Sequence, residues 1–128
     1  SLFRKDSLEM GESDRELMAS RVASDPNDRI LITHGTDTMV ETGRRLGKIQ
    51  GKTIVLTGAM RPATFKDSDG PFNIGFAVAA LQTLPPGVYI AMNGRIFDPE
   101  TAQKNTAFDR FEDADPSQAE RTDPEWPT

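Results

Sequence analysis

Short apolar runs alternate along this chain with longer amphipathic segments. Three runs rich in β-branched residues are bounded by glycine or turn residues, which is typical of buried strands; they cover residues 30–32, 53–57 and 88–92. Helical patterning is found in three segments, which cover residues 13–23, 38–46 and 71–81. Strands that alternate with helices predict an α/β fold, a Rossmann-like three-layer sandwich whose mainly parallel sheet carries helices on both faces.

Local signals predict where several elements begin and turn. Ser13 and Glu16 have capping-box spacing, so we expect the first helix to open at Ser13. Asn93-Gly94 is a two-residue turn signal, and residues 95–97 are expected to return as an antiparallel partner of the preceding strand. Residues 101–108 form a short polar segment in which no regular element is predicted.

Composition excludes several classes of function. The chain has 128 residues, enough for one domain with a real core, and it contains no apolar run long enough to cross a bilayer. It has no cysteine, and its single histidine, His34, cannot form a multi-histidine metal site. Residues 109–128 hold seven acidic and two basic residues, which accounts for the whole net charge of −5. The neutral remainder argues against nucleic-acid binding.

The same observations give expectations for domain organisation and compartment. We expect one domain over residues 1–111 and an acidic, proline-containing tail over residues 112–128 that is mobile or loosely docked. No charged and apolar leader is present at the start of the chain, so a cytoplasmic protein is expected.

The stretch from Ile30 to Met39 carries the candidate chemistry. A buried strand is followed by a turn at Gly35 and by two polar residues, Thr36 and Asp37, at the start of the next helix. A lysine beside a threonine can take its proton, and an aspartate can hold the lysine or a substrate amine, which makes Lys104 a candidate partner. Helix capping is the commoner role for Thr36 and Asp37, and pattern alone favours a solvated surface lysine. His34 is expected to be a core or turn histidine that bonds backbone.

Several ordered segments resemble the bacterial-type L-asparaginase and glutaminase family. The second family signature is similar to Thr33-His34-Gly35-Thr36-Asp37-Thr38-Met39. The other matching segments are Asp6-Ser7-Leu8-Glu9-Met10, Thr57-Gly58-Ala59-Met60-Arg61-Pro62, Ser68-Asp69-Gly70-Pro71-Phe72-Asn73, Val88-Tyr89-Ile90-Ala91-Met92-Asn93 and Lys104-Asn105-Thr106. The resemblance spans about residues 4–111, and the short chain looks most like the single-domain members of the family.

This resemblance implies an amidohydrolase that converts asparagine, or glutamine, to the acid and ammonia without a metal or organic cofactor. Thr36 would be the triad hydroxyl, Lys104 its proton acceptor, and Asp37 the residue that binds the substrate α-amino group. Ser7 would bind the α-carboxylate. Gly35 and Thr36 would lie against the substrate, and Ala59 would line the pocket. The family also implies a homo-oligomer, because a neighbouring subunit usually completes the active site.

One family signature is absent from this sequence. The Thr-Gly-Gly-Thr-Ile type segment at the end of the family's first strand carries the primary nucleophilic threonine, and no stretch of these 128 residues supplies it. We therefore expect a domain that lacks its first strand and does not run the reaction alone. Two hypotheses remain open: an asparaginase-type domain seen without its nucleophile segment, or a catalytically silent amino-acid-binding or assembly domain. A nucleotide-binding Rossmann domain is discounted because no Gly-x-Gly-x-x-Gly or Walker-type run is present.

Overall fold

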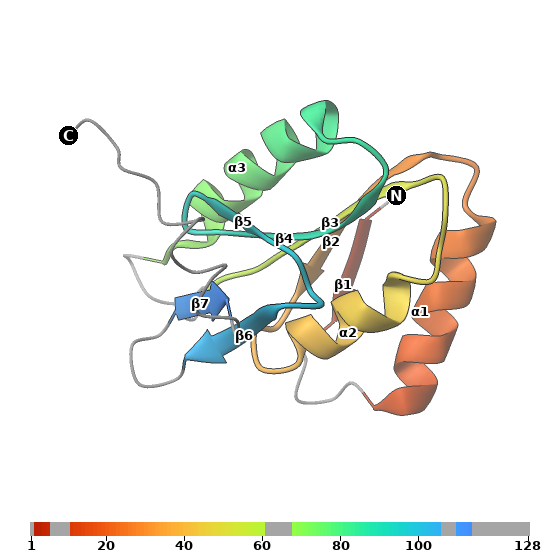
Figure 1. Cartoon of the computed structure of the whole chain (residues 1–128), viewed down its shortest axis with the longest axis horizontal. Helices are drawn as coiled ribbons and strands as arrows, with labels where there is room; N and C mark the ends of the chain where they lie inside the picture. The colour runs from red at the N-terminus through yellow and green to blue at the C-terminus, as the bar shows by residue number, and fades with distance from the viewer. Residues whose placement is uncertain (1, 6–10, 61–67, 106–109, 114–128) are drawn as a thin grey trace.

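A computed structural model describes residues 2–5, 11–60, 68–105 and 110–113 (Figure 1). Five strands form one sheet in the order β1-β2-β3-β4-β5, with β1 to β4 parallel and β5 antiparallel to β4. These strands are β1 (Leu2–Lys5), β2 (Arg29–His34), β3 (Thr53–Thr57), β4 (Gly87–Met92) and β5 (Arg95–Phe97). The helices are α1 (Glu12–Ser24), α2 (Met39–Leu46) and α3 (Gly70–Thr83). The predicted mainly parallel α/β fold is confirmed.

Side chains of the central strands alternate between two hydrophobic layers. Ile32 and Leu56 point to the face covered by α1 and α2, where they pack with Met18 and Met39. Neighbouring residues of the same strands, such as Val55, point to the opposite face and pack against α3. Figure 1 shows α3 on one side of the sheet and α1 with α2 on the other. A strand buried on both faces explains why these runs are continuously apolar in sequence.

The connection through α3 is unusual for a parallel sheet. Strands β1, β2, β3 and β4 follow one another in a single direction across the sheet. The crossovers through α1 and α2 lie on one face, and the crossover through α3 lies on the other. Crossovers that advance in the same direction on opposite faces have opposite hands. Because about 98% of such connections are right-handed, the crossover through α3 is the exceptional one.

Several predicted boundaries shift by one or two residues, and three strands were not predicted. Helix α1 begins at Glu12, not at Ser13, because the backbone N–H of Gly11 donates to the Asp14 carboxylate at 3.0 Å and fixes the first turn one residue earlier. Strand β1 was missed. Strands β6 (Ala102–Asn105) and β7 (Arg110–Asp113) were also missed, and they form an antiparallel pair. Strand β7 spans the predicted boundary between domain and tail at residues 111 and 112. Residues 114–128 lie outside the described residues, and the division into a domain and a tail stays a prediction.

An aromatic contact and a buried alanine attach the β6–β7 pair to the main core. Phe111 is 2% exposed, and its ring centroid lies 6.1 Å from that of Phe97 in β5. Ala102 is fully buried in the same cluster. Side chains of β6 are thereby held at a fixed position beside the large sheet, which matters for Lys104.

An exposed ion pair joins α1 to α2 and gives a pH-dependent prediction. Arg45 Nε and its terminal nitrogen donate to the two carboxylate oxygens of Glu16 at 2.6 and 2.7 Å. The Arg45 hydrogen bonds lower the pKa of Glu16 below its usual value of 4.5. A depressed carboxyl pKa means that the pair stabilises the fold above the unfolded-state pKa, and that this stabilisation is lost as the pH falls through the folded-state pKa.

We expect Arg45→Gln to return the Glu16 titration to its ordinary range. The carboxyl carbon of Glu16, followed by NMR through an acid titration, reports this shift directly. Arg21→Gln, an exposed arginine on the same helix α1, is the matched control and should leave the Glu16 titration where it was. An unchanged Glu16 titration in Arg45→Gln would show that the two side chains are not paired in solution.

Candidate functional site

Three of the candidate side chains meet at the carboxyl end of β2. Thr36 and Asp37 lie in the turn between β2 and α2, and Lys104 reaches them from β6. The Lys104 ammonium donates to Thr36 Oγ1 at 2.8 Å and to Asp37 Oδ1 at 2.6 Å. These residues are 67 or 68 positions apart in sequence, so the fold alone brings them together. The carboxyl ends of parallel strands are where α/β sheets place ligands.

Burial differs among the three groups in a way that suits a binding site. Thr36 is 9% exposed, and the side chain of Lys104 is 17% exposed. The Asp37 side chain is 51% exposed, so its carboxylate faces solvent while one oxygen contacts Lys104. The Thr36 hydroxyl and the Lys104 amino group are close enough to pass a proton between them. The solvent-facing Asp37 carboxylate can attract a cationic group from solution.

The more ordinary roles of these residues do not match their contacts. Thr38 is the N-cap residue of helix α2, and its side chain makes no capping hydrogen bond. Thr36 and Asp37 instead accept hydrogen bonds from Lys104. Lys104 is correspondingly paired, not a solvated surface lysine.

The structure describes two of the three remaining predicted residues. Gly35 lies half-buried at the end of β2, and Ala59 lies half-buried just after β3, the neighbouring strand. Ser7 lies outside the described residues. Position 58 requires glycine, because a Cβ there would stand 2.2 Å from the backbone oxygen of His34. The ends of β2 and β3 therefore approach too closely for any side chain at position 58.

A chain of hydrogen bonds runs behind the Gly35 turn. Arg15 Nε donates to Thr42 Oγ1 at 3.3 Å, and Thr42 Oγ1 lies 2.9 Å from His34 Nε2. His34 Nδ1 lies 2.6 Å from the backbone oxygen of Gly35. A carbonyl oxygen can only accept, so Nδ1 carries a proton, and in the neutral imidazole Nε2 accepts from the Thr42 hydroxyl. His34, Thr42 and Arg15 are buried. The prediction that His34 is a buried histidine bonded to backbone is confirmed.

Thr42→Val tests this arrangement, because valine keeps the shape and removes the hydroxyl. We expect a loss of about 1–3 kcal/mol of folding free energy, since Arg15 Nε and His34 Nε2 lose a buried partner. The chain has one histidine, so long-range nitrogen NMR of the imidazole shows its tautomer without ambiguity. The wild type should carry the proton on Nδ1; a proton on Nε2 would contradict the assignment. Thr83→Val, at an exposed threonine near the end of α3, should change stability by less than about 0.5 kcal/mol.

A second network, also not predicted from sequence, joins the ends of β3 and β4. Asn73, fully buried in α3, donates to the backbone oxygen of Gly58 at 2.8 Å and to Asp69 Oδ2 at 3.0 Å. Its side-chain oxygen accepts from the backbone N–H of Asn93 at 2.8 Å. Asp69 Oδ2 also accepts from the backbone N–H of Met60 at 3.0 Å. The loop that carries Ala59 is therefore fixed by α3.

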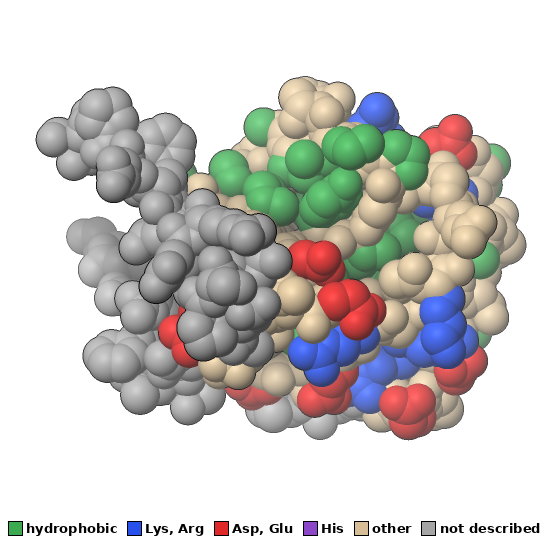
Figure 2. All heavy atoms as spheres, viewed as in Figure 1, with side chains coloured by type: hydrophobic (Ala, Val, Ile, Leu, Met, Phe, Trp, Pro, Cys, Tyr) green, Lys and Arg blue, Asp and Glu red, His purple; other side chains and the backbone are tan. Residues whose placement is uncertain are grey.

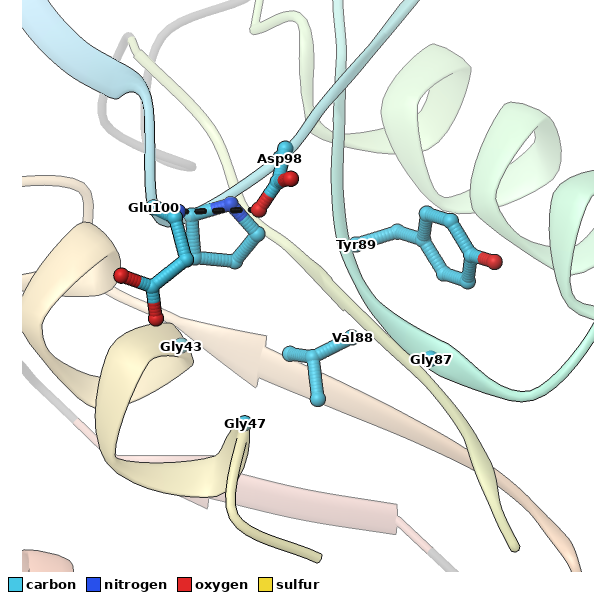
Figure 3. A pocket seen from close by; sticks show the side chains of 8 residues that line it. Gly43, Gly47, Gly87, Val88, Tyr89, Asp98 and Glu100 are labelled. Atoms are coloured by element: carbon cyan, nitrogen blue, oxygen red, sulfur yellow. Dashed lines mark hydrogen bonds between the residues drawn. The ribbon is translucent and has the colours of Figure 1, made fainter. Parts of the chain in front are cut away.

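A cavity of about 290 Å³ lies at the opposite end of the sheet (Figure 3). It is lined by the C-terminal part of α2, the first residues of β4 and the segment after β5: Gly43, Gly47, Gly87, Val88, Tyr89, Asp98, Pro99 and Glu100. The Asp98 carboxylate accepts the backbone N–H of Glu100 at 2.9 Å, which orders this segment. The cavity contains none of the candidate catalytic residues and does not belong to the site at Thr36.

Among the described residues, no cluster of three or more His, Cys, Asp or Glu side chains could hold a metal ion. No helix within this described part of the chain has the length and apolar character that a membrane crossing requires.

The sequence of this chain is similar to those of known proteins. Residues 1–122 match the family model described as "Asparaginase, N-terminal". The chain is 40% identical over 90 residues to L-asparaginase 2 of Escherichia coli, covering 66% of this chain and 26% of that protein. It is 38% identical over 109 residues to the glutaminase-asparaginase of Pseudomonas aeruginosa, covering 81% of this chain and 29% of that protein.

A solved structure gives the same result. The crystal structure of the probable cytoplasmic L-asparaginase from Campylobacter jejuni superposes with a TM-score of 0.76 at 34% sequence identity, covering 85% of this chain and 38% of that chain. The chain thus spans only about a quarter to a third of the length of the curated relatives it matches.

Proposed function

The chain belongs to the asparaginase family, because most of it matches the model of that family's N-terminal domain. We propose that it carries the amino-acid-binding and proton-relay part of an asparaginase-type amidohydrolase. The observation that supports this most is the Lys104 ammonium held at 2.8 Å from Thr36 and 2.6 Å from Asp37. Relatives named L-asparaginase and glutaminase-asparaginase point to asparagine, or glutamine, as the substrate.

The proposed binding mode follows from charge and exposure. A free amino acid carries an α-ammonium group, and the half-exposed Asp37 carboxylate is an anionic partner at the mouth of the site. Asp37 Oδ1 contacts Lys104, so Oδ2 would accept from the substrate ammonium. Ser7 would bind the α-carboxylate, and Gly35, Thr36 and Ala59 would lie against the substrate.

The proposed chemistry is amide hydrolysis by way of an acyl intermediate. A threonine hydroxyl oxygen attacks the side-chain carboxamide carbon, the C–N bond breaks, and the nitrogen leaves as ammonia after it gains a proton. Lys104, as a neutral amine, accepts the proton of the attacking hydroxyl through Thr36 Oγ1 and then, as an ammonium, gives it to the leaving nitrogen. In the second half it accepts a proton through Thr36 from the water that attacks the ester, and it returns this proton to the threonine oxygen as the ester C–O bond breaks. No metal or organic cofactor takes part in this proposal.

The nucleophile itself would come from a segment that this sequence does not contain, the Thr-Gly-Gly-Thr type signature of the family. The second candidate function is a catalytically silent domain that binds an amino acid or assembles with other chains. The two candidates make different predictions for turnover, and not for binding.

The test is ammonia release from L-asparagine by the protein translated from the complete reading frame that contains these residues. We expect turnover, and we expect Lys104→Met to lower kcat by at least about 100-fold, because proton transfer contributes 10²–10⁴-fold to such reactions. Lys48→Met, an exposed lysine after α2, is the matched control. Full activity in Lys104→Met would overturn the proposed relay. Binding of L-aspartate without any ammonia release would favour the silent domain.

A further inference from the structure

Two hydrogen bonds hold the peptide groups on either side of Ala59, one of the proposed pocket residues. The oxygen of the peptide that joins Gly58 to Ala59 accepts from Asn73 Nδ2 at 2.8 Å. The N–H of the peptide that joins Ala59 to Met60 donates to Asp69 Oδ2 at 3.0 Å. Because a residue has only two soft backbone dihedral angles, fixing both peptide planes leaves the backbone of Ala59 little freedom. The position of the Ala59 methyl group therefore depends on where Asp69 and Asn73 are held.

Asp69 does not make the contact that its place in the chain predicts. It is the N-cap residue of α3, where an aspartate ordinarily accepts from the backbone of the first helical turn, but its side chain makes no capping hydrogen bond. Its Oδ2 atom instead accepts from three amide groups: the backbone N–H of Met60, Asn73 Nδ2 at 3.0 Å and Asn93 Nδ2 at 3.2 Å. These donors lie in the loop after β3, in α3 and in the turn between β4 and β5. Asp69 thus ties that turn to the loop that carries Ala59.

Asn93 suits both the backbone of its turn and its contact with Asp69. Its φ is 52°, in the left-handed region, and two-residue turns of this kind favour Asn, Asp or Gly there. Asparagine is the one of these three residue types whose side chain can donate to a carboxylate. Glycine has no side chain, and an aspartate would place a second carboxylate against Asp69. The side chain of Asn93 is exposed, so burial in the core does not explain the choice of residue. The contact with Asp69 does.

The network lies at the same end of the sheet as Thr36 and Asp37. Strands β2, β3 and β4 are parallel, so the segments that follow them meet at one edge, and Figure 1 shows the β4–β5 turn beside the start of α3. In Figure 2 Lys, Arg, Asp and Glu side chains gather over α1 and α2, whereas hydrophobic side chains gather in the region of α3 and β4. Substitutions at Asn93 are therefore remote from the ion pairs that join α1 to α2.

We propose that Asn93 is a positioning residue for the amino-acid site, and that it acts on the bound ligand through Asp69 and Ala59 without touching the ligand. The Asn93 amide holds the Asp69 carboxylate, which holds the N–H of Met60. This sets the place at which Ala59 meets the ligand. A displacement of about 1 Å in such a wall is enough to weaken its contacts with a small ligand greatly. The inference rests on the proposed function, because it requires an amino acid to lie against Ala59.

Two substitutions at Asn93 separate this role from a role in the turn itself. Asn93→Gly keeps a residue that suits the left-handed backbone and removes the donor. Asn93→Asp also suits the turn, and it sets a carboxylate against that of Asp69. Titration calorimetry with L-aspartate, well below the unfolding temperature, measures the affinity of the folded protein, which a loss of stability alone does not change. We expect the dissociation constant to rise at least about fivefold in Asn93→Gly and at least about 20-fold in Asn93→Asp.

Asn27 provides the matched control at the opposite end of the sheet. Its Nδ2 donates to Asp25 Oδ1 at 2.9 Å in the turn before β2, so Asn27→Gly and Asn27→Asp remove and reverse the same kind of contact. Both should bind L-aspartate within about twofold of the wild type. Equal affinity in the wild type and in the two Asn93 variants would overturn this inference and leave the proposed function standing. A wild-type chain that binds no L-aspartate would overturn the proposed function, and this inference with it.

Hydrogen exchange of the Met60 amide tests the link between the turn and the loop without any ligand. The Met60 N–H and the Asn93 amide share Asp69 Oδ2 as their acceptor, so loss of the Asn93 amide should leave the carboxylate less firmly held. We expect the Met60 amide to exchange at least about fivefold faster in Asn93→Gly than in the wild type, and at the wild-type rate in Asn27→Gly. An unchanged Met60 rate in Asn93→Gly would overturn the proposal, because the turn would then not hold the loop at Ala59.

Discussion

Replacing Asp37 with Asn should weaken the binding of L-aspartate by at least about 100-fold. Asp37 is the anionic group proposed to accept the ligand's α-ammonium, and it also holds Lys104 at 2.6 Å. Asparagine keeps the size of the side chain and removes the charge. A hydrogen bond to a charged group contributes about 1.5–3 kcal/mol, and the freed Lys104 ammonium would in addition repel the ligand's ammonium. Titration calorimetry measures the effect.

The matched control for Asp37→Asn is Asp28→Asn. Asp28 is exposed in the turn before β2, at the end of that strand away from the site. Both substitutions change the net charge by one, so a non-specific electrostatic effect would appear in both. Equal affinity for L-aspartate in the wild type and in Asp37→Asn would contradict the assignment of Asp37.

Replacing Asn73 with Leu should cause the largest loss of stability of any substitution considered. The amide of Asn73 satisfies the backbone oxygen of Gly58, the backbone N–H of Asn93 and the Asp69 carboxylate, all around a fully buried position. Leucine fills similar space and removes the hydrogen bonds to the Gly58 oxygen and the Asn93 N–H, at about 1–3 kcal/mol for each bond lost, and one of the hydrogen bonds to Asp69. We expect a loss of about 3–5 kcal/mol.

Denaturant unfolding at fixed protein concentration measures this loss, because any association also contributes to the stability. Gln50→Leu, which makes the same amide-to-leucine change at an exposed position after α2, should stay within about 0.5 kcal/mol of the wild type. A small effect of Asn73→Leu would show that the network does not hold the loop at Ala59 in place.

Sequence patterning predicts the strands that are buried on both faces and the helices that are buried on one side. The runs that contain Ile32, Val55 and Ile90 are mainly apolar because both faces of each strand are covered, and all three form strands of the sheet. The Asn93-Gly94 turn is predicted because a hairpin of this type needs positive φ, and both residues have it, at 52° and 80°.

Elements that depend on distant partners are not visible in the local pattern. Strand β6 is the polar sequence Ala-Gln-Lys-Asn, which has little intrinsic strand preference, and it forms because β7 pairs with it and Phe111 packs against Phe97. Strand β1 is four residues long and pairs with β2 across a whole helical crossover.

The candidate site likewise has residues that the sequence indicates and contacts that only the fold shows. Resemblance to a family indicates Thr36, Asp37 and Lys104, but residue types and spacing alone favour helix capping and a solvated lysine. The supporting contacts of Arg15 with Thr42, and of Asn73 with Gly58, join side chains or backbone atoms across different elements. Only the folded chain brings these atoms together, although a buried asparagine within an apolar helix is a signal that could have indicated Asn73.

The measurement that tests the central claim most directly is titration calorimetry of this chain with L-aspartate and, in parallel, with succinate. Succinate has both carboxylates of aspartate and lacks the α-ammonium group that Asp37 is proposed to bind. Saturable binding of L-aspartate that is at least about ten times tighter than that of succinate is the result expected from the site at Thr36, Asp37 and Lys104. Equal affinity for the two ligands, or no binding of L-aspartate, would contradict it.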